Sequence, residues 1–382
     1  DVLIMGAVVK DLSHSFDSYW NNERAYPVQS LISKDELEAM HRSSAAPHAT
    51  ANTNPSPAAG NGDAPQASSS ASNDTGNRPL PPDGEPRPQS PATAEQLARA
   101  WDMQPLNLRS TPLIWARAVM VADAPSKIPA VDSDGQAAPL DAPGAEHHGV
   151  IESKTLGQLR MAAAATAHMA PADSVVDGLV QLLGYAKKDL LIVSPYFVPG
   201  DSMRAAFKTA VQRGVRVRIL TNSLSSNDAP IAHVGYARYR EELLKDGVEL
   251  YELVSNDSNL RAAFGLGSNG NSFRDGKRVM LHSKVLALDG QLLVVGSMNL
   301  DQRSKLQNTE IAVLVRSRKL AGEATEMIEK GLHMGAWHVQ LQDGKLVWKA
   351  PYGSTLSADT TEPDTSLPLR LMLKIIAPIT PD

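Results

Sequence analysis

Hydrophobic residues in the second half of the chain follow two alternating spacings. Short runs rich in Val, Ile and Leu are separated by segments in which apolar residues recur every three or four positions. The first spacing is typical of buried strands and the second of amphipathic helices. The predicted strands are 189–197, 215–222 and 248–254, and the predicted helices are 174–187, 201–213 and 229–246. This alternation predicts an α/β fold with a largely parallel or mixed sheet.

The same two spacings extend to both ends of the chain. They predict a strand at 309–315, a helix at 319–332 and a hairpin that turns at Asp343-Gly344. Toward the N-terminus they predict a short buried strand at 1–6, helices at 9–23 and 93–103, and a strand at 113–123.

The composition changes abruptly after residue 40. Residues 41–92 are mostly Ala, Ser, Pro, Asn, Gly and Asp, with almost no large apolar residue. Such a segment cannot bury enough surface to offset the entropy lost on ordering, so we predict a disordered low-complexity insertion. The segment 93–173 then connects to the regular part of the chain, and it contains a second loose loop at 124–149.

Length, charge and cysteine content narrow the function classes. A chain of 382 residues is long enough for two ordinary domains, and its net charge of −5 argues against a protein that coats a polyphosphate backbone. The absence of cysteine excludes disulfides and thiolate metal sites. The sequence also contains no apolar run approaching the roughly 20 residues of a membrane-spanning helix.

One short stretch, LHSKVLALDGQLLVVGSMN at 281–299, collects several reactive side chains. We predict that it forms a strand, a turn at Asp289-Gly290 and a returning strand. His282 and Lys284 then lie on one face, because residues two apart on a strand point the same way. Ser297 and Asn299 alternate onto one face where the second strand ends. A base, a cation, a hydroxyl and an amide are thus predicted to converge.

These groups suit a phosphoryl centre. A lysine neutralises non-bridging oxygens, and Ser and Asn side chains donate hydrogen bonds to them. Histidine can attack phosphorus or pass a proton to the leaving oxygen, and no metal is required. We expect Glu310, at the start of the next strand, to orient His282 through its second ring nitrogen. Each residue alone is commonly structural, but six fixed positions together favour function.

The pattern His-x-Lys-x4-Asp-x6-Gly-Ser-x-Asn resembles the HKD motif of the phospholipase D superfamily. The matching residues are His282, Lys284, Asp289, Gly296, Ser297 and Asn299. The segments 194–200, 219–228, 233–253 and 297–310 also resemble bacterial phospholipase D-like proteins of the cardiolipin synthase group.

The resemblance implies a phospholipase D-like α/β fold in which two pseudo-symmetric halves each give one HKD set to a single site. One histidine forms a phosphohistidine and the other, here His282, acts as acid and base. Lys284, Ser297 and Asn299 become phosphate ligands. Asp289, although part of the catalytic motif, becomes a mainly structural acid, and Glu310 the residue that orients His282. The resemblance implies no cofactor and no metal.

The chain contains one His-x-Lys, so it carries one of the two expected motifs. Residues 1–30 resemble the segment that follows the first motif, and a shift of the numbering by 311 superposes this strand and helix on those after His282. We therefore expect 1–40 to be the remnant of an incomplete first half and 174–350 to be the second half. The first motif is expected upstream, and this chain alone is expected to lack half of the active site.

Three other regions carry candidate binding residues. His233, Tyr236 and Arg240 lie on one face of the predicted helix 229–246, where they either line a headgroup pocket or face solvent. Tyr196 lies at the end of a predicted strand, a common place for sites in α/β folds. The tail 351–382 contains an apolar stretch with Arg370 and Lys374, predicted as either a membrane-surface helix or a helix that covers the core.

The expected function is phosphatidyl transfer, with cardiolipin made from phosphatidylglycerol and a second phospholipid. The alternatives are hydrolysis to phosphatidic acid, cleavage of nucleic acid, and a non-catalytic lipid-binding remnant. The expected partners are a phospholipid substrate and a membrane surface, with no nucleic acid. The expected location is the bacterial cell envelope, at the inner membrane on a side that the sequence leaves open.

Overall fold

The computed structural model of the chain describes residues 2–22, 25–26, 33–34, 111–128, 174–255 and 280–377. Residues 1–25 and 114–382 form one compact unit. The predicted insertion at 41–92, the predicted helix at 93–103 and most of the connecting segment 93–173, with most of its loop 124–149, lie outside the described residues.

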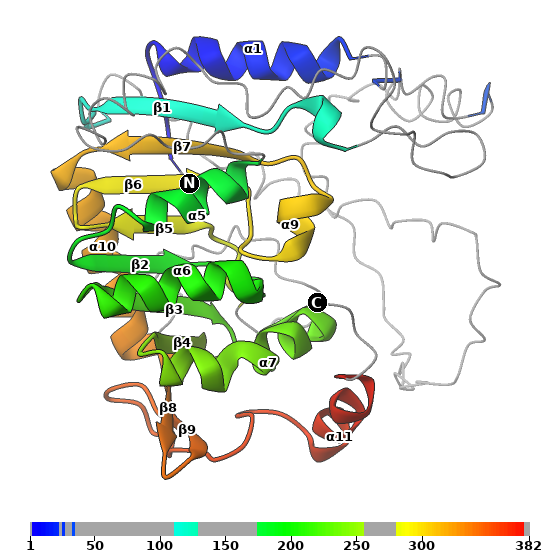
Figure 1. Cartoon of the computed structure of the whole chain (residues 1–382), viewed down its shortest axis with the longest axis vertical. Coiled ribbons are helices and arrows are strands. Elements are labelled where there is room, and N and C mark those ends of the chain that lie inside the picture. Colours follow the sequence, from blue (N-terminus) through cyan, green and yellow to red (C-terminus); the bar gives the residue numbers. More distant parts are fainter. Residues whose placement is uncertain are drawn as a thin grey trace, which may run out of the picture. The chain divides into compact units, whose positions relative to one another are not determined.

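The described part of the chain forms one nine-stranded sheet in the order β1-β7-β6-β5-β2-β3-β4-β8-β9 (Figure 1). The strands are β1 (Arg117–Ala122), β2 (Asp189–Val193), β3 (Arg216–Asn222), β4 (Glu249–Leu253), β5 (Val285–Leu288), β6 (Leu292–Gly296), β7 (Ile311–Arg316), β8 (Ala336–Gln342) and β9 (Lys345–Lys349). The central strands β2, β3 and β4 are parallel, and all other neighbours are antiparallel. The predicted mixed α/β sheet is confirmed.

Helices cover both faces of this sheet. The helices of the parallel β-α-β units, α6 (Gly200–Gln212) and α7 (Pro230–Lys245), lie on one face together with α5 (Val175–Leu183), as right-handed crossovers require. The long helix α10 (Arg318–Gly335) lies on the other face (Figure 1). No helix among the described residues has both the length and the apolar character needed to cross a bilayer.

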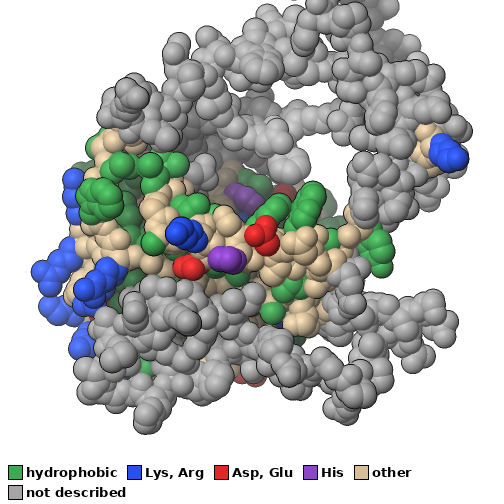
Figure 2. Space-filling view, turned by 90° about the horizontal axis from the view of Figure 1, so that it is seen from above, with side chains coloured by type: hydrophobic (Ala, Val, Ile, Leu, Met, Phe, Trp, Pro, Cys, Tyr) green, Lys and Arg blue, Asp and Glu red, His purple; other side chains and the backbone are tan. Residues whose placement is uncertain are grey.

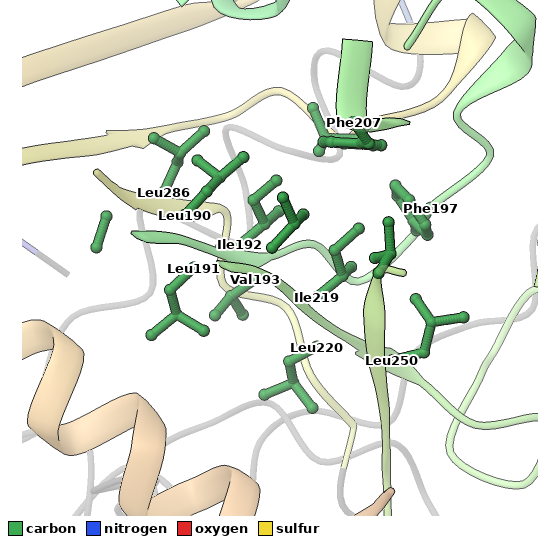
Figure 3. Close-up of a cluster of buried hydrophobic side chains, with 14 of the residues drawn as sticks. Leu190, Leu191, Ile192, Val193, Phe197, Phe207, Ile219, Leu220, Leu250 and Leu286 are labelled. Atoms are coloured by element: carbon green, nitrogen blue, oxygen red, sulfur yellow. The ribbon is translucent and has the colours of Figure 1, made fainter. Parts of the chain in front are cut away.

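The core lies between the sheet and these helices, and its centre is formed by β2 and β3 (Figure 3). Leu190 and Leu191 point to opposite faces, and both are completely buried. A strand covered on both faces needs apolar residues at every position, which explains why these runs do not alternate with polar residues.

One edge of the sheet is formed by β1, which pairs with β7 over six residues and packs against α1 (Val8–Trp20). The predicted helix at 9–23 is confirmed, but the predicted strand at 1–6 is wrong, since residues 2–5 pair with no strand in the described part of the chain. Ile4 of this apolar run instead packs against Val8, Met120 and Ala122 through its side chain. The division of the chain into two halves remains a prediction.

The outer side of α1 carries apolar side chains at the surface. Phe16 and Trp20 are 61% and 70% exposed, and their rings stack with centroids 5.7 Å apart. Figure 2 shows the molecule from above the view of Figure 1, and on this side hydrophobic side chains lie among charged and histidine side chains.

The sequence did not predict the helix α9 (Gln302–Leu306). Five residues are too few to display a helical period. Asp301 is the N-cap residue of this helix, and its carboxylate accepts a hydrogen bond of 2.7 Å from the Ser304 N–H.

Candidate active site

The strand register brings both ends of the 281–299 stretch to one edge of the sheet. Val285, at the start of β5, pairs with Val193 at the end of β2 and with Val295 near the end of β6. His282 and Lys284 therefore precede β5 at the same edge where Ser297 and Asn299 follow β6. This is the edge at which the parallel strands β2, β3 and β4 end, a common place for sites in α/β folds.

His282 and Lys284 lie against each other at this edge. The Lys284 Nζ is 3.4 Å from Nε2 and 3.5 Å from Nδ1 of His282, and it donates a hydrogen bond of 3.0 Å to the His282 carbonyl oxygen. His282 is exposed and Lys284 is partly buried. The predicted base and cation are thus adjacent and open to a substrate.

Partial removal of the imidazole from solvent, followed by the neighbouring Lys284 charge, lowers the pKa of His282 below its ordinary value, while Asp228 opposes the shift. The imidazole is therefore largely neutral near neutral pH, the form that accepts a proton. Burial also lowers the pKa of Lys284, and the carboxylates of Glu310, Asp301 and Asp228 oppose this shift. A bound phosphodiester would add a negative charge beside His282 and favour its protonated form.

The backbone beside His282 is held by Asn222, the last residue of β3. The Asn222 Oδ1 accepts from the Leu281 N–H at 2.9 Å, and its Nδ2 donates to the Leu281 carbonyl at 3.0 Å and to the Pro195 carbonyl at 3.1 Å. A buried side-chain amide thus replaces a strand partner where the β5 ladder has not yet begun. Sequence reasoning missed this residue, whose signals were an amide at the end of an apolar strand and its place in the segment 219–228.

Tyr196 lies at the same edge, next to a carboxylate that sequence reasoning also missed. Its hydroxyl donates to Asp228 Oδ1 at 2.6 Å. Burial and then Asp228 raise the pKa of Tyr196 well above its ordinary value, so the phenol stays neutral. The negative charge of Asp228 also acts on His282, whose pKa it raises. Its only sequence signal was its place in the segment 219–228.

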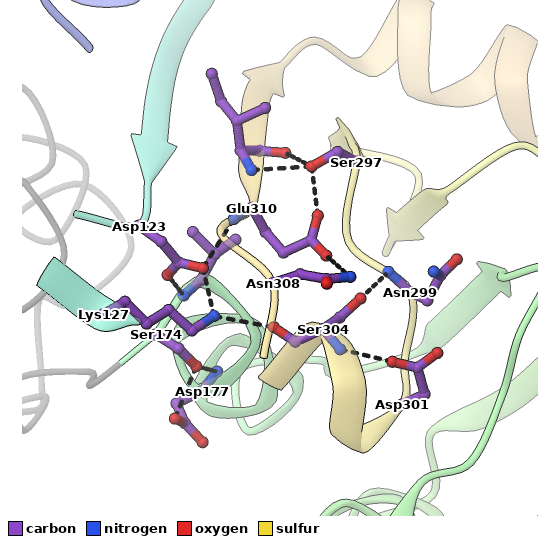
Figure 4. Close-up of polar contacts among 12 residues, drawn as sticks. Asp123, Lys127, Ser174, Asp177, Ser297, Asn299, Asp301, Ser304, Asn308 and Glu310 are labelled. Atoms are coloured by element: carbon purple, nitrogen blue, oxygen red, sulfur yellow. Dashed lines mark hydrogen bonds and ion pairs between the residues drawn. The ribbon is translucent and has the colours of Figure 1, made fainter. Parts of the chain in front are cut away.

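Ser297 and Glu310 are bonded to each other (Figure 4). The Ser297 hydroxyl donates to Glu310 Oε2 at 2.5 Å and accepts from the Ile311 N–H at 3.0 Å. The other carboxylate oxygen of Glu310 accepts from Asn308 Nδ2 at 3.4 Å. The expected contact between Glu310 and His282 is not among the hydrogen bonds of these described residues. Ser297 can donate to a phosphate only if its hydroxyl turns away from Glu310.

A buried ion pair lies behind Glu310. Asp123 follows β1, and its Oδ2 accepts from the Glu310 N–H at 2.9 Å and from Lys127 Nζ at 2.5 Å. The Asp123 backbone N–H donates to the Glu310 carbonyl at 2.8 Å. These contacts fix the backbone of Glu310 from a segment 187 positions away, a relationship that no local pattern could reveal.

Asn299 follows β6, and its backbone N–H donates to the Ser304 hydroxyl at 3.0 Å (Figure 4). Its side-chain Oδ1 is buried and has no hydrogen-bond partner among the described residues. This oxygen only accepts hydrogen bonds, so a phosphate oxygen would have to be bound by the Nδ2 group of the same amide.

Gly296 lets β6 approach β7 closely. A Cβ atom at this position would lie 2.4 Å from the Ile311 carbonyl oxygen and 2.8 Å from the Met298 sulfur. The glycine of the motif therefore has a steric role.

Asp289 lies at the opposite end of β5 from His282. Its carboxylate accepts hydrogen bonds from the backbone N–H groups of Lys187, Lys188 and Asp189, at 2.8 to 3.2 Å. Its backbone has φ 53°, which belongs to the turn. The structure thus separates this acid of the motif from the other motif side chains and gives it the contacts of a structural residue.

His233, Tyr236 and Arg240 are buried in α7, with exposed fractions of 3%, 2% and 2%. Arg240 pairs with Glu252 at 3.0 Å and with Glu362 at 2.7 Å, and it lies over the Tyr236 ring. The solvent-facing alternative is therefore wrong. Direct contact of Arg240 with a substrate would require these ion pairs to open.

Comparisons with known proteins agree with this geometry. Residues 179–331 match the family model described as a cardiolipin synthase, phospholipase D-like domain. They form a phospholipase D-like domain. This domain includes the whole 281–299 stretch, its strands β5 and β6, and the strand β2 that pairs with β5.

The similarity to relatives extends beyond the phospholipase D-like domain. Cardiolipin synthase C of Escherichia coli is 27% identical over 380 residues, which cover 98% of this chain and 63% of that protein. An uncharacterized protein of Helicobacter pylori is 36% identical over 187 residues, which cover 49% of this chain and 35% of its length. The chain thus spans less than two thirds of these curated relatives.

Solved structures show weaker similarity. Phosphatidylserine synthase of Haemophilus influenzae is 16% identical, with a TM-score of 0.37 over 53% of this chain and 42% of that chain. The phospholipase D family member Nuc of Salmonella typhimurium is 19% identical, with a TM-score of 0.31 over 42% of this chain and 88% of that chain.

Proposed function

We propose that this chain belongs to a phosphatidyltransferase that makes cardiolipin from phosphatidylglycerol and a second phospholipid. The observation that carries the proposal is the adjacent pair His282 and Lys284, which lies at the sheet edge where Ser297 and Asn299 follow β6. The similarity to cardiolipin synthase C over 98% of the chain supports the choice of substrate.

In the proposed reaction, a histidine of a second half-site attacks phosphorus. A P–N bond forms while the bond from phosphorus to the glycerol oxygen breaks, and His282 gives its proton to that oxygen. The hydroxyl of the second lipid then gives its proton to His282, and its oxygen attacks phosphorus as the P–N bond breaks. Lys284 and Asn299 stabilise the charge on the non-bridging oxygens throughout, and Ser297 joins them when its hydroxyl turns.

We propose that the second half-site comes from a segment that precedes residue 1 in the longer protein. In that case the 382-residue chain has no turnover as a monomer. Size-exclusion chromatography combined with an activity assay tests this point. Turnover by a verified monomer of this chain would contradict it, whereas activity confined to a dimer would mean that two copies of His282 complete the site.

The reaction is tested on the longer protein with phosphatidylglycerol vesicles, with and without phosphatidylethanolamine. Cardiolipin is the expected product, and His282→Ala should abolish it. His14→Ala, at an exposed histidine of α1, is the matched control and should leave the rate unchanged. Phosphatidic acid as the only product would favour the alternative, phospholipase D hydrolysis. Cleavage of plasmid DNA without lipid products would favour a nuclease.

We further propose that the protein works at a membrane surface in the bacterial cell envelope, since its proposed substrates are bilayer lipids. Cell fractionation tests this location. Recovery of the longer protein in the membrane fraction is expected, and recovery only in the soluble fraction would contradict it.

A further inference from the structure

The C-terminal helix α11 (Leu367–Ile376) has apolar side chains on two sides. On the inner side, Leu369 and Leu373 pack against Leu224 and Val234. On the outer side, residues that recur every four positions are exposed: Leu367 by 70%, Leu371 by 58% and Ile375 by 66%. The inner side therefore fixes the helix on the domain, and the outer side presents an apolar row to the surroundings.

The helix is anchored at both ends. Before it, Glu362 pairs with the buried Arg240 at 2.7 Å, and Ser366 caps the first turn. After it, Arg238 of α7 donates to the Ala377 carbonyl. With these contacts the outer row has a fixed direction relative to the domain.

The charged residues of α11 itself have one sign. Arg370 and Lys374 lie one turn apart on α11, and residues 367–377 contain no Asp or Glu. An exposed apolar row next to cations is the pattern of helices that lie on anionic bilayers, where Leu and Ile enter the interface and Lys and Arg meet phosphate groups.

The apolar surface continues toward the candidate active site. Ile231, Val234 and Arg238 share the face of α7 on which α11 lies, since they are three and four positions apart. Ile231 is 61% exposed and lies three residues after Asp228, which bonds Tyr196 at the site edge. A flat surface resting on α11 and Ile231 would thus meet the molecule next to this edge.

We propose that the outer row of α11, together with Ile231, binds the surface of an anionic phospholipid bilayer and holds the active-site edge against the lipid headgroups. This surface is defined by Ile231, Leu367, Leu371, Lys374 and Ile375. The proposal rests on the proposed function, which gives the reason why the protein binds lipids. Vesicle binding itself requires no turnover.

The experiment is cosedimentation of the 382-residue chain with vesicles of equal parts phosphatidylglycerol and phosphatidylcholine, and with vesicles of phosphatidylcholine alone. Preferential binding to the anionic vesicles is expected. The double variant Leu371→Ser/Ile375→Ser should lower the partition coefficient roughly tenfold, because it removes buried apolar area. Lys374→Glu should lower it and weaken its dependence on salt.

The matched controls lie on α10, on the other face of the sheet. Met327→Ser, at a side chain 54% exposed, and Lys330→Glu should leave the partition unchanged. Unchanged thermal unfolding of every variant separates loss of binding from loss of folding.

Three outcomes would overturn the proposal. The first is absence of vesicle binding by the unmodified chain, and the second is equal loss of binding in the α10 controls. The third is conversion of a dimer to a monomer by Leu371→Ser/Ile375→Ser, which would assign the row to a contact between copies. Vesicle binding without cardiolipin synthesis by the longer protein would refute the proposed function and leave this inference intact.

Discussion

The Nζ of Lys284 lies 3.4 Å from the Nε2 of His282 and 3.0 Å from the His282 carbonyl oxygen, to which it donates. The lysine therefore stabilises the position of the histidine backbone and also acts electrostatically on its ring. A cation at this distance disfavours a second positive charge, and so it favours the neutral imidazole.

Replacing Lys284 by Met should raise the pKa of His282 toward its ordinary value of 6.5, because one of the causes that lower it is removed. Histidine NMR titration measures this value, with His282→Ala to assign the signal. Lys330→Met, at an exposed lysine on α10, should leave it unchanged. An unchanged or lower pKa in Lys284→Met would contradict the electrostatic role.

The same shift links His282 to stability. Because its folded pKa is lowered, the unfolded chain binds more protons at acidic pH. The contribution of His282 is therefore present above about pH 6.5 and is lost as the pH falls through its folded pKa. In Lys284→Met the folded pKa of His282 should lie closer to the unfolded value. Urea unfolding at a series of pH values should then show this loss of stability over a narrower pH range.

Asp289→Ala should lower the free energy of unfolding by about 1–3 kcal/mol, because three backbone N–H groups lose their acceptor. The matched control is Asp343→Ala in the other Asp-Gly hairpin turn, where the backbone φ is 48° instead of 53°. Both variants carry the cost of alanine at positive φ, so the difference between them measures the lost hydrogen bonds. Urea unfolding gives both values. Equal losses would contradict the role of Asp289 as the acceptor for these three backbone N–H groups.

Arg240→Gln should destabilise the fold by about 3–5 kcal/mol, because it leaves the completely buried Glu252 without its cation. Burial alone would raise the pKa of Glu362, but Arg240 and His233 lower it to about 2. The variant should therefore raise this pKa as well.

The control for Arg240 is Arg216→Gln. Arg216 pairs with Glu249 at 2.7 Å, but its side chain is 54% exposed, so a loss of about 0–1 kcal/mol is expected. Thermal or urea unfolding compares the two variants. Similar losses would show that burial does not control the strength of the Arg240 contacts.

Gly296→Ala should destabilise the β6–β7 pairing by about 1–3 kcal/mol, since the new methyl group would overlap the Ile311 carbonyl. Gly322→Ala in α10 is the control, because nothing lies within 4 Å of its Cβ position. It should stabilise the helix by about 0.5–1 kcal/mol. If Gly296→Ala were neutral in urea unfolding, the steric role of this glycine would be wrong.

Local pattern was sufficient to predict the α/β class and most elements. The apolar runs of β2 and β3 and the helical spacing of α6 and α7 are set by residues close in sequence, and their periods follow from backbone geometry. The same holds for His282 and Lys284, because a spacing of two on an extended chain brings both side chains to one side. The short helix α9 and the strand predicted at 1–6 show where a segment is too short, or lacks a partner, for pattern to decide.

The surroundings of the site were decided by tertiary structure. Asn222 holds Leu281 beside the histidine, and Asp123 holds Glu310. Arg240 meets Glu362 across 122 positions, and Asp289 lies at the far end of the strand from His282. The sequence by itself determined which reactive groups this chain carries and how they are spaced along it. For residues close in sequence, this spacing and the local backbone geometry decide which side chains lie together. Strand order and register decided which groups meet, because contacts between distant segments form only when the sheet assembles.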